Sequence, residues 1–323
     1  MGLGDGMDLT IVGSGGSQPT PKAGCNCRVC TAARREGGRH VRTGPSLYLH
    51  DARLLIDTPE EANFRLAALE LAPRFILWTH AHPDHAAGAR VVEFLFETRG
   101  QPVETYMAHD LYQSMRERYA LDYLVGRGFL QITITAPRAS FSLGPVQVTP
   151  LRHLIPEPVY SYLIEIDGQR LLYAPDHYSS LPVPDGDVQV AVVQTARIPQ
   201  DYLPEPLPEN HPAFKVEKGW RDVIGSWQGR TENLIFTHLY ESIRMLPEEY
   251  DRLASSAGGP WVKFAHDGMT LTTLKQPASA PAMGLQAYKS RREELNRLYG
   301  SQPEKLREEL RRLNDEYEKS RNP

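Results

Sequence analysis

The chain has 323 residues, 41% of them hydrophobic and 24% charged, with a formal net charge of −4 at pH 7. This composition is that of an ordinary globular protein, and the slight acidity gives no general attraction to nucleic acid or to anionic lipid. No apolar run is long enough to cross a bilayer and the first residues show no secretory signal, so we expect a cytoplasmic protein without a membrane partner.

The N-terminal part of the chain alternates strand patterns with loops. Residues 8–12 alternate polar and apolar side chains and lead into a glycine-rich loop at 13–17, which predicts a strand followed by a flexible connection. Residues 46–50 and 53–57 predict two strands joined by a turn, and residues 60–71 have the apolar spacing of a helix.

A short apolar run at 75–78 predicts a buried strand, and helices are predicted at 86–99 and 109–119. Further strands are predicted at 130–134, 146–151, 160–166, 170–173, 188–194, 234–237 and 262–265. The Asp167-Gly168 pair favours a tight hairpin between two of them, because it suits a primed two-residue turn. Strands, then helices, then strands again predict an α/β protein of two sheets with helices packed outside.

The character of the chain changes past residue 275. Residues 276–281 resemble a linker, and two charged helices are predicted at 285–299 and 303–320. The second helix carries an apolar stripe formed by Leu306, Leu310, Leu313 and Tyr317. We therefore divide the chain into a main domain at 1–275 and a helical extension at 276–323. The extension would pack on the main domain or pair two subunits as a homodimer, and the alternative is a solvated tail.

One loop reads Thr-His-Ala-His-Pro-Asp-His and places three imidazoles and a carboxylate within six consecutive positions. His80 and His82 point the same way in an extended segment, since side chains alternate along a strand. Pro83 turns the chain, so Asp84 and His85 address a second point in space. These ligands suit zinc, manganese or iron, and the economical interpretation is two neighbouring divalent metal ions. The alternative is a polar loop whose histidines coincide by chance.

Three more residues of ligand type directly follow predicted strands, namely His153, Asp176 and His238. A rigid scaffold of this kind can hold ligands in place at the edge of a sheet. We expect these side chains to converge on the loop that carries His80 and His85. A carboxylate such as Asp176 can bridge two cations.

The order of these motifs resembles that of the metallo-β-lactamase-fold hydrolases, whose signature is His-x-His-x-Asp-His with later His, Asp and His ligands. The resemblance covers residues 7–270 and implies an αββα sandwich, with two mixed β-sheets face to face and helices outside. It also implies two metal ions, the first bound by His80, His82, His153 and Asp176, and the second by Asp84, His85, Asp176 and His238. Asp57 matches a buried acidic residue that supports the family's metal site from outside.

All three cysteines lie close together, at Cys25, Cys27 and Cys30. An odd and tightly spaced set predicts metal binding rather than a disulfide framework. The segment resembles the structural zinc motif of a subset of the family that includes the cyclic phosphodiesterases of bacterial phosphonate breakdown. That subset has a histidine as fourth ligand, where this chain has Glu241. Glu241 or His40 would complete a zinc site, or the cysteines stay free thiols.

Other histidines are candidates for a role at the same site. The position of His211 is comparable with that of a substrate-side histidine in the phosphodiesterase relatives, which implies a proton donor for the leaving group. The alternative is an exposed loop histidine. His177 would face the cavity or the surface, and residues 266–269 resemble a turn that follows the family's last core strand.

These residues predict a metal-dependent hydrolase. Two divalent cations would lower the pKa of a shared water and neutralise charge on the attacked group. An anionic phosphodiester suits such a centre. The first hypothesis is therefore a phosphodiesterase acting on small or cyclic phosphodiesters, with Asp84 and His211 as catalytic residues.

Three alternatives stay open. One is hydrolysis of an acyl ester, thioester or lactone. Another is transfer-RNA 3′ processing. The acidic net charge disfavours it, and so does the lack of an insertion rich in glycine and basic residues. The third is a metal-binding protein of cofactor biosynthesis that performs no catalysis.

Overall fold

The computed structural model describes residues 6–209, 211, 218–256, 259–273, 285–299 and 303–321. The chain forms two compact units, Met1–Thr273 and Leu274–Pro323. Among the described residues, none of the helices combines the length and the apolar character needed to span a bilayer.

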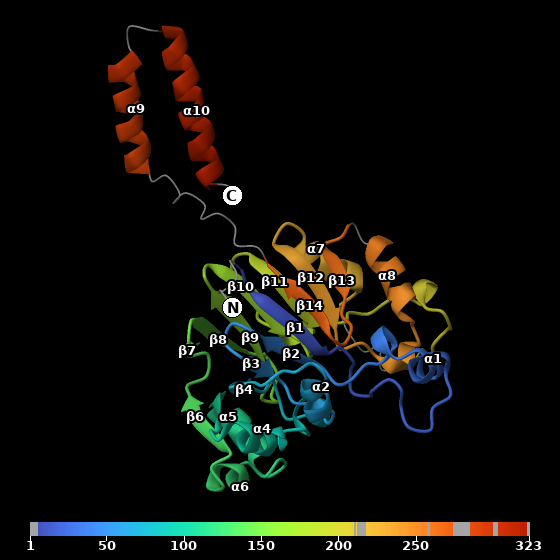
Figure 1. Ribbon diagram of the computed structural model, residues 1–323. Coiled ribbons are helices and arrows are strands. Elements are labelled where there is room, and N and C mark those ends of the chain that lie inside the picture. The colour runs from blue at the N-terminus through green and yellow to red at the C-terminus, as the bar shows by residue number, and fades with distance from the viewer. Residues whose placement is uncertain are drawn as a thin grey trace. The chain divides into compact units, whose positions relative to one another are not determined.

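The first unit contains two seven-stranded sheets (Figure 1). The first sheet has the order β14 (Met269–Thr272), β1 (Asp8–Gly13), β2 (Ser46–Leu49), β3 (Leu54–Ile56), β4 (Phe75–Leu77), β5 (Val103–Ala108) and β6 (Leu130–Thr135). Its pairs from β14 to β3 are antiparallel and those from β3 to β6 are parallel. The sheet is therefore mixed, as the resemblance implied.

The second sheet is also mixed. It has the order β13 (Val262–Phe264), β12 (Thr231–Thr237), β11 (Val188–Gln194), β10 (Gln169–Ala174), β9 (Tyr160–Ile166), β8 (Val146–Arg152) and β7 (Phe141–Leu143). Strands β10 to β13 are parallel, and the others are antiparallel. The predicted hairpin joins β9 and β10, and both turn residues, Asp167 and Gly168, have the positive φ angles of a primed turn, 49° and 79°.

Helices cover the outer faces of both sheets. Those beside the first sheet are α2 (Ala62–Ala68), α4 (Val91–Arg99), α5 (His109–Arg116) and α6 (Leu121–Gly126), whereas the short α3 (Pro83–Ala86) follows the loop after β4. Those beside the second sheet are α7 (Trp220–Trp227) and α8 (Pro247–Ser256), and α1 (Arg28–Glu36) lies near α8 (Figure 1). The predicted αββα sandwich is confirmed, although the helix expected at 86–99 begins only at Val91, as α4.

Strand β11 shows how the layers are held together. Val190 and Val192 pack in a core cluster that also contains Ile11 of the first sheet. Ala191 and Val193 belong to a second cluster with residues of α7 and α8. Because successive side chains of a strand point to opposite faces, a continuous apolar run serves both cores at once.

The two sheets are joined where β4 ends. The backbone N–H of Tyr160 donates to the carbonyl of Thr79 at 2.8 Å, and the Tyr162 hydroxyl donates to the carbonyl of Trp78 at 2.6 Å. The loops after β3, β4, β10 and β12 follow the carboxyl ends of strands in the two parallel halves. Ligand sites of α/β proteins form at the carboxyl ends of strands. The loops at these ends carry most of the predicted site residues.

The second unit is a helical hairpin of α9 (Leu285–Tyr299) and α10 (Pro303–Arg321). Leu295 and Leu313 are buried, and the Tyr288 hydroxyl donates to Asn314 Oδ1 at 2.6 Å. Both predicted helices are thus present. The predicted linker at 276–281 lies outside the described residues.

Candidate metal centre

The loop after β4 is held by the carboxylate of Asp57, which follows β3 and is fully buried. The Thr79 N–H donates to Asp57 Oδ1 at 2.7 Å, and the Thr79 hydroxyl donates to both carboxylate oxygens. The residue before Pro83 is extended and Pro83 opens α3, in line with the preferences of proline. Asp84 and His85 therefore lie in the first turn of a short helix, directly after the extended residue His82.

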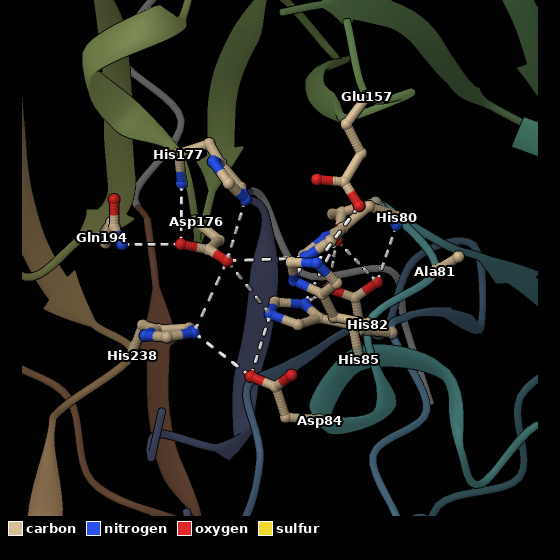
Figure 2. Close-up of polar contacts among 12 residues, drawn as sticks. His80, Ala81, His82, Asp84, His85, Glu157, Asp176, His177, Gln194 and His238 are labelled. Carbon is tan, nitrogen blue, oxygen red and sulfur yellow. Dashed lines mark hydrogen bonds and ion pairs between the residues drawn. The ribbon is translucent and has the colours of Figure 1, made fainter. Parts of the chain in front are cut away.

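The first group of ligand-type atoms comprises His80, His82, Asp176 and His177, all within 4.8 Å of one another. His80 Nε2 lies 2.9 Å from His82 Nδ1 and 3.5 Å from Asp176 Oδ2. His177 Nε2 lies 3.6 Å from the same carboxylate oxygen. These side chains come from the loops after β4 and β10 and point toward one another (Figure 2).

The second group comprises Asp84, His85 and His238, again within 4.8 Å. His238 Nε2 lies 3.3 Å and His85 Nε2 lies 3.5 Å from Asp84 Oδ2. Asp176 Oδ2 is 3.8 Å from His238 Nε2 and 4.0 Å from His85 Nε2. The Asp176 carboxylate therefore lies between both groups, where a bridging ligand is expected (Figure 2).

Two buried nitrogen atoms test whether the groups suit metal ions. His85 Nε2 and His238 Nε2 make no hydrogen bond although both are buried. Buried polar atoms of this kind are rare in native proteins unless an ion or water meets them. Imidazole nitrogens around ionised carboxylates are the donor set of zinc, manganese or iron. The residues of both groups thus fit divalent metal ions.

Burial and charge hold His80, Asp176 and Asp84 in the protonation states that metal binding needs. Burial, helped by the charge of His85, lowers the pKa of His80 to about 3, so that this imidazole is neutral at pH 7. Burial by itself raises the pKa of Asp176, but the surrounding imidazoles, His238 first, hold it well below its usual value. Asp84 behaves in the same way beside His238. Neutral imidazoles and ionised carboxylates bind metals.

Residues outside the two groups fix the orientation of their members. Asp57 Oδ2 lies 2.8 Å from His85 Nδ1, as the resemblance implied, and Glu157 Oε1 lies 3.2 Å from His82 Nε2. Gln194 Nε2 donates to Asp176 Oδ1 at 2.6 Å. Glu157 and Gln194 were not expected from the sequence. The sequence offers one signal for Gln194, which is that it is the polar residue at the end of the buried apolar strand β11.

Three residues of the centre have left-handed backbone conformations. The φ angles are 67° at Asp57, 53° at His177 and 57° at His238. Non-glycine residues seldom adopt such angles, and those that do cluster at functional sites where the surrounding structure imposes them.

His153, which the resemblance implies as a ligand of the first ion, belongs to neither of the two groups. Its Nε2 is 2.7 Å from Ser161 Oγ, and its Nδ1 is 3.0 Å from Ser180 Oγ and 3.1 Å from the carbonyl of His177. Both ring nitrogens are thus engaged by β9 and by the turn after β10. His177 has a left-handed backbone, its ring lies near that of His80, and it belongs to the first group.

His211 is not brought into either group. Its backbone N–H donates to the carbonyl of Pro208 at 2.9 Å. Burial, followed by the positive charge of Arg244, lowers its pKa. Proton donation by His211 therefore stays a prediction, without support from its described contacts.

The three cysteines converge on Glu241. Glu241 Oε1 lies 3.6, 3.2 and 3.4 Å from the sulfur atoms of Cys25, Cys27 and Cys30. The second oxygen, Oε2, lies 3.1 Å from Lys22 Nζ. This set of three sulfurs and one carboxylate is the cysteine cluster below. Three thiolates and a carboxylate are ligands that zinc accepts.

The other residue proposed to complete the cysteine cluster, His40, lies elsewhere. Its Nε2 is 2.9 Å from a carboxylate oxygen of Glu36 and 3.8 Å from one of Glu248. Glu241 is therefore the fourth ligand-type residue of the cluster.

The predicted turn at 266–269 supports the centre from a distance. The buried carboxylate of Asp267 accepts hydrogen bonds from the backbone and hydroxyl of Ser14 and of Thr43, at 2.7–2.9 Å. It thereby fixes the glycine-rich loop after β1. Gly16 of this loop packs so closely on His238 that a Cβ atom would lie 2.9 Å from Nδ1.

Known proteins are similar to this chain in sequence over part of its length and in fold over most of it. The family described as the beta-lactamase superfamily domain matches residues 52–185, which include the loop of His80 and the strand end of Asp176. The octanoyltransferase of Porphyromonas gingivalis (strain ATCC BAA-308 / W83) is 32% identical over 156 residues. That match covers 45% of this chain and only 30% of the relative's length.

Two solved structures are similar over most of the chain. A diphosphatase from the PhnP family is 19% identical with a TM-score of 0.61, covering 83% of this chain and 97% of that one. Zn²⁺-bound PqqB from Methylobacterium extorquens is also 19% identical, with a TM-score of 0.62, covering 82% of this chain and 99% of that one. Likeness at this level of identity concerns the fold.

Proposed function

We propose that this chain, a member of the metallo-β-lactamase-fold superfamily, is a metal-dependent hydrolase with two neighbouring divalent ions. His80, His82 and His177 would hold the first ion, and Asp84, His85 and His238 the second. Asp176 would bridge them. The observation that carries the proposal is the position of Asp176 Oδ2, which has imidazole nitrogens of both groups within 4.0 Å.

When bound, divalent cations at this place supply an activated water nucleophile and positive charge against the charge that develops on the substrate. The protein's own residues set the geometry. Asp57 and Glu157 orient His85 and His82, and Gln194 turns the second oxygen of Asp176 away from the centre. Such outer contacts are typically worth about 10- to 100-fold in metal affinity or activity.

A phosphodiester is the substrate class that we propose first. The exposed guanidinium of Arg118 lies 3.5 Å from the carbonyl of Ala81, between two ligand residues, and the Tyr119 hydroxyl donates to the same carbonyl at 2.8 Å. A cationic side chain at this rim favours an anionic substrate, because guanidinium groups pair well with phosphate oxygens. Small or cyclic phosphodiesters fit this arrangement.

Hydrolysis of an acyl ester or thioester is the second candidate. It is favoured by one observation, the likeness to a protein named octanoyltransferase. A carbonyl substrate would use the same centre, but it would gain less from Arg118 because it carries no negative charge before attack.

The cysteine cluster belongs to the same proposal as a structural zinc site. It would tie the loop before α1 to the segment after β12, since Cys25 and Cys27 lie in the former and Glu241 in the latter. A metal held by four such ligands contributes folding energy rather than catalysis.

Turnover assays on metal-replete protein test the proposed activity. We expect cleavage of bis(p-nitrophenyl) phosphate, and a loss of more than about 100-fold in His82→Ala and Asp176→Asn, because both residues belong to the groups. His109→Ala is the matched control, since this histidine is exposed and lies outside both groups.

Parallel assays with p-nitrophenyl octanoate and an octanoyl thioester separate the two candidates. Cleavage of the acyl substrates without the phosphodiester would overturn the first in favour of the second. Protein that binds two metal ions yet cleaves neither class would contradict hydrolysis and favour a metal-binding role.

A further inference from the structure

His238 differs from the other imidazoles of the centre in how its ring is held. Asp57 contacts the outer nitrogen of His85, Thr79 Oγ1 lies 3.0 Å from that of His80, and Glu157 contacts that of His82. Neither ring nitrogen of His238 has a hydrogen-bond partner within the described part of the chain, although the side chain is buried. Since metal-binding histidines usually donate their second nitrogen to a fixed partner, another device must orient this ring.

The glycine-rich loop after β1 provides the first set of contacts that orient this ring. Leu239 N–H donates to the carbonyl of Ser14 at 2.9 Å, and Gly16 N–H donates to the carbonyl of Leu239 at 3.1 Å. Gly16 also packs against the His238 ring. Together with the left-handed φ of 57°, these contacts restrict the direction in which the imidazole leaves the chain.

The cysteine cluster provides the second set of contacts that orient this ring. Glu241 lies three positions after His238, is only 5% exposed, and has its carboxylate against the three cysteine sulfurs. The segment 238–241 is therefore fixed at one end by the glycine-rich loop and at the other by the cluster.

Tyr240 connects the same segment to the bridging carboxylate. Its ring packs edge-on against His238 with centroids 5.5 Å apart. Its hydroxyl accepts a hydrogen bond of 3.0 Å from Gln194 Nε2, which also donates to Asp176 Oδ1 at 2.6 Å. Figure 2 shows Gln194 and His238 on the same side of Asp176. Movement of this segment would thus disturb two residues of the centre.

We propose that a metal ion in the cysteine cluster anchors residues 238–241 through Glu241 and thereby positions His238 and Asp176 for the ions of the active centre. This inference rests on the proposed metal centre but goes beyond it, because it makes the affinity of one site depend on the occupancy of another. Glu241 is a positioning residue in this scheme. Without the cluster's metal, the partners of its carboxylate among the described residues are weak S–H donors and Lys22.

Cobalt binding to the full-length protein tests the coupling. Charge-transfer absorption from thiolate to Co²⁺ reports the cysteine cluster, and competition with a chromophoric chelator reports Co²⁺ affinity at the His/Asp centre. In Glu241→Ala we expect the charge-transfer band to need more Co²⁺ to develop, because three thiolates remain but the fourth ligand is lost. We also expect a fall of about 10- to 100-fold in affinity at the centre. Glu241→His, which offers a nitrogen ligand, should restore both signals to within a few-fold of the wild type.

Glu249→Gln is the matched control. Glu249 forms a 2.9 Å ion pair with Arg28 of α1, the helix that carries Cys30, without touching the cluster or the centre. We expect wild-type values from this variant. Should Glu241→Ala fail to fold by circular dichroism, Cys25→Ser replaces it, because this cysteine is half-buried rather than central to a core.

Two outcomes are distinguishable. A charge-transfer band that needs more Co²⁺ to develop, with an unchanged affinity at the His/Asp centre, would overturn the coupling while leaving the proposed hydrolase intact. Wild-type protein that binds Co²⁺ only at the cluster would overturn the proposed centre, and the coupling with it.

Discussion

At the scale of single residues, Asp57 illustrates how a group outside the ligand set controls the centre. Burial by itself lowers the pKa of His85, but the Asp57 carboxylate at 2.8 Å outweighs it and raises that pKa to about 9. His85 therefore carries a proton in the metal-free protein below about pH 9. A metal ion must displace this proton, so its apparent affinity rises with pH up to that value.

Asp57→Asn should remove this dependence. The amide oxygen can still accept from Thr79, so the loop keeps its anchor, but the amide N–H₂ would donate to His85 Nδ1 and leave the proton on Nε2, where the metal must bind. We expect a 10- to 100-fold lower affinity and a flatter profile between pH 7 and 9. Chelator competition at pH 7, 8 and 9 measures both.

Asp122→Asn is the control for this comparison, since Asp122 is an exposed carboxylate paired with Arg116 and lies outside the metal groups. A pH profile of Asp57→Asn that keeps the wild-type slope would contradict the assignment of the proton to His85.

Side-chain direction is the part of the centre that spacing could not predict. The loop of His80 and the strand ends before Asp176 and His238 follow from local patterns, and the structure brings them together. The position of His153 does not follow, because it depends on Ser161 of β9 and on Ser180 after β10. The place of His177 in the first group likewise depends on one left-handed φ angle, which local spacing does not reveal.

At the scale of elements, two glycines let the loops of the centre approach each other. A Cβ atom on Gly44 would lie 2.4 Å from Pro59 Cβ and 2.6 Å from the carbonyl of Asp84. A Cβ atom on Gly88 would lie 2.1 Å from the carbonyl of Pro59. The segment before β2 and the turn after α3 therefore pack directly on the loop after β3.

Gly44→Ala should separate these segments. The added methyl group meets the rigid ring of Pro59 and the carbonyl of Asp84 rather than the end of a flexible side chain. We therefore expect destabilisation of about 1–3 kcal/mol together with weaker metal binding. Gly126→Ala is the matched control, because a Cβ there meets nothing within 4 Å and the position ends α6. It should be neutral or slightly stabilising. Thermal unfolding of both variants tests this prediction. Equal unfolding midpoints for Gly44→Ala and Gly126→Ala would contradict the close packing at Gly44.

Elements with strong apolar runs were predictable, and those that depend on partners were not. The expected strands from 130–134 to 262–265 are all present, whereas β5, β7 and β14 were not anticipated. Strand β7 has three residues and exists through its pairing with β8. Helix α7 was not predicted, and its buried Trp220 and Trp227 indicate that tertiary packing stabilises it.

At the scale of the whole molecule, the centre depends on both sheets. Asp57 and the loop of His80 follow strands of the first sheet, and Asp176 and His238 follow strands of the second. Because the ligand residues come from both sheets, bound metal ions would also raise the free energy of unfolding of the sandwich. Anything that binds only the folded state stabilises it.

The C-terminal hairpin contributes no residue to the described metal groups. The first unit also closes on itself before the hairpin begins. Strand β14 pairs with β1, the Thr273 N–H donates to the carbonyl of Met7, and the Met7 N–H donates to Gln169 Oε1 at 3.1 Å. The fold and the centre should therefore both survive without residues 275–323.

A chain of residues 1–274 tests this independence. We expect wild-type metal stoichiometry and an unfolding midpoint within a few degrees of the full chain, because no core residue of the sandwich is removed. A chain ending at Gly268 is the contrasting control, since it lacks β14 and leaves β1 as an unpaired edge, which favours aggregation. Light scattering of the 1–274 chain also tests the expectation that the hairpin pairs two subunits, in which case the truncated protein would be monomeric and the full chain dimeric. Loss of metal binding in the 1–274 chain would show that the hairpin takes part in the fold of the first unit.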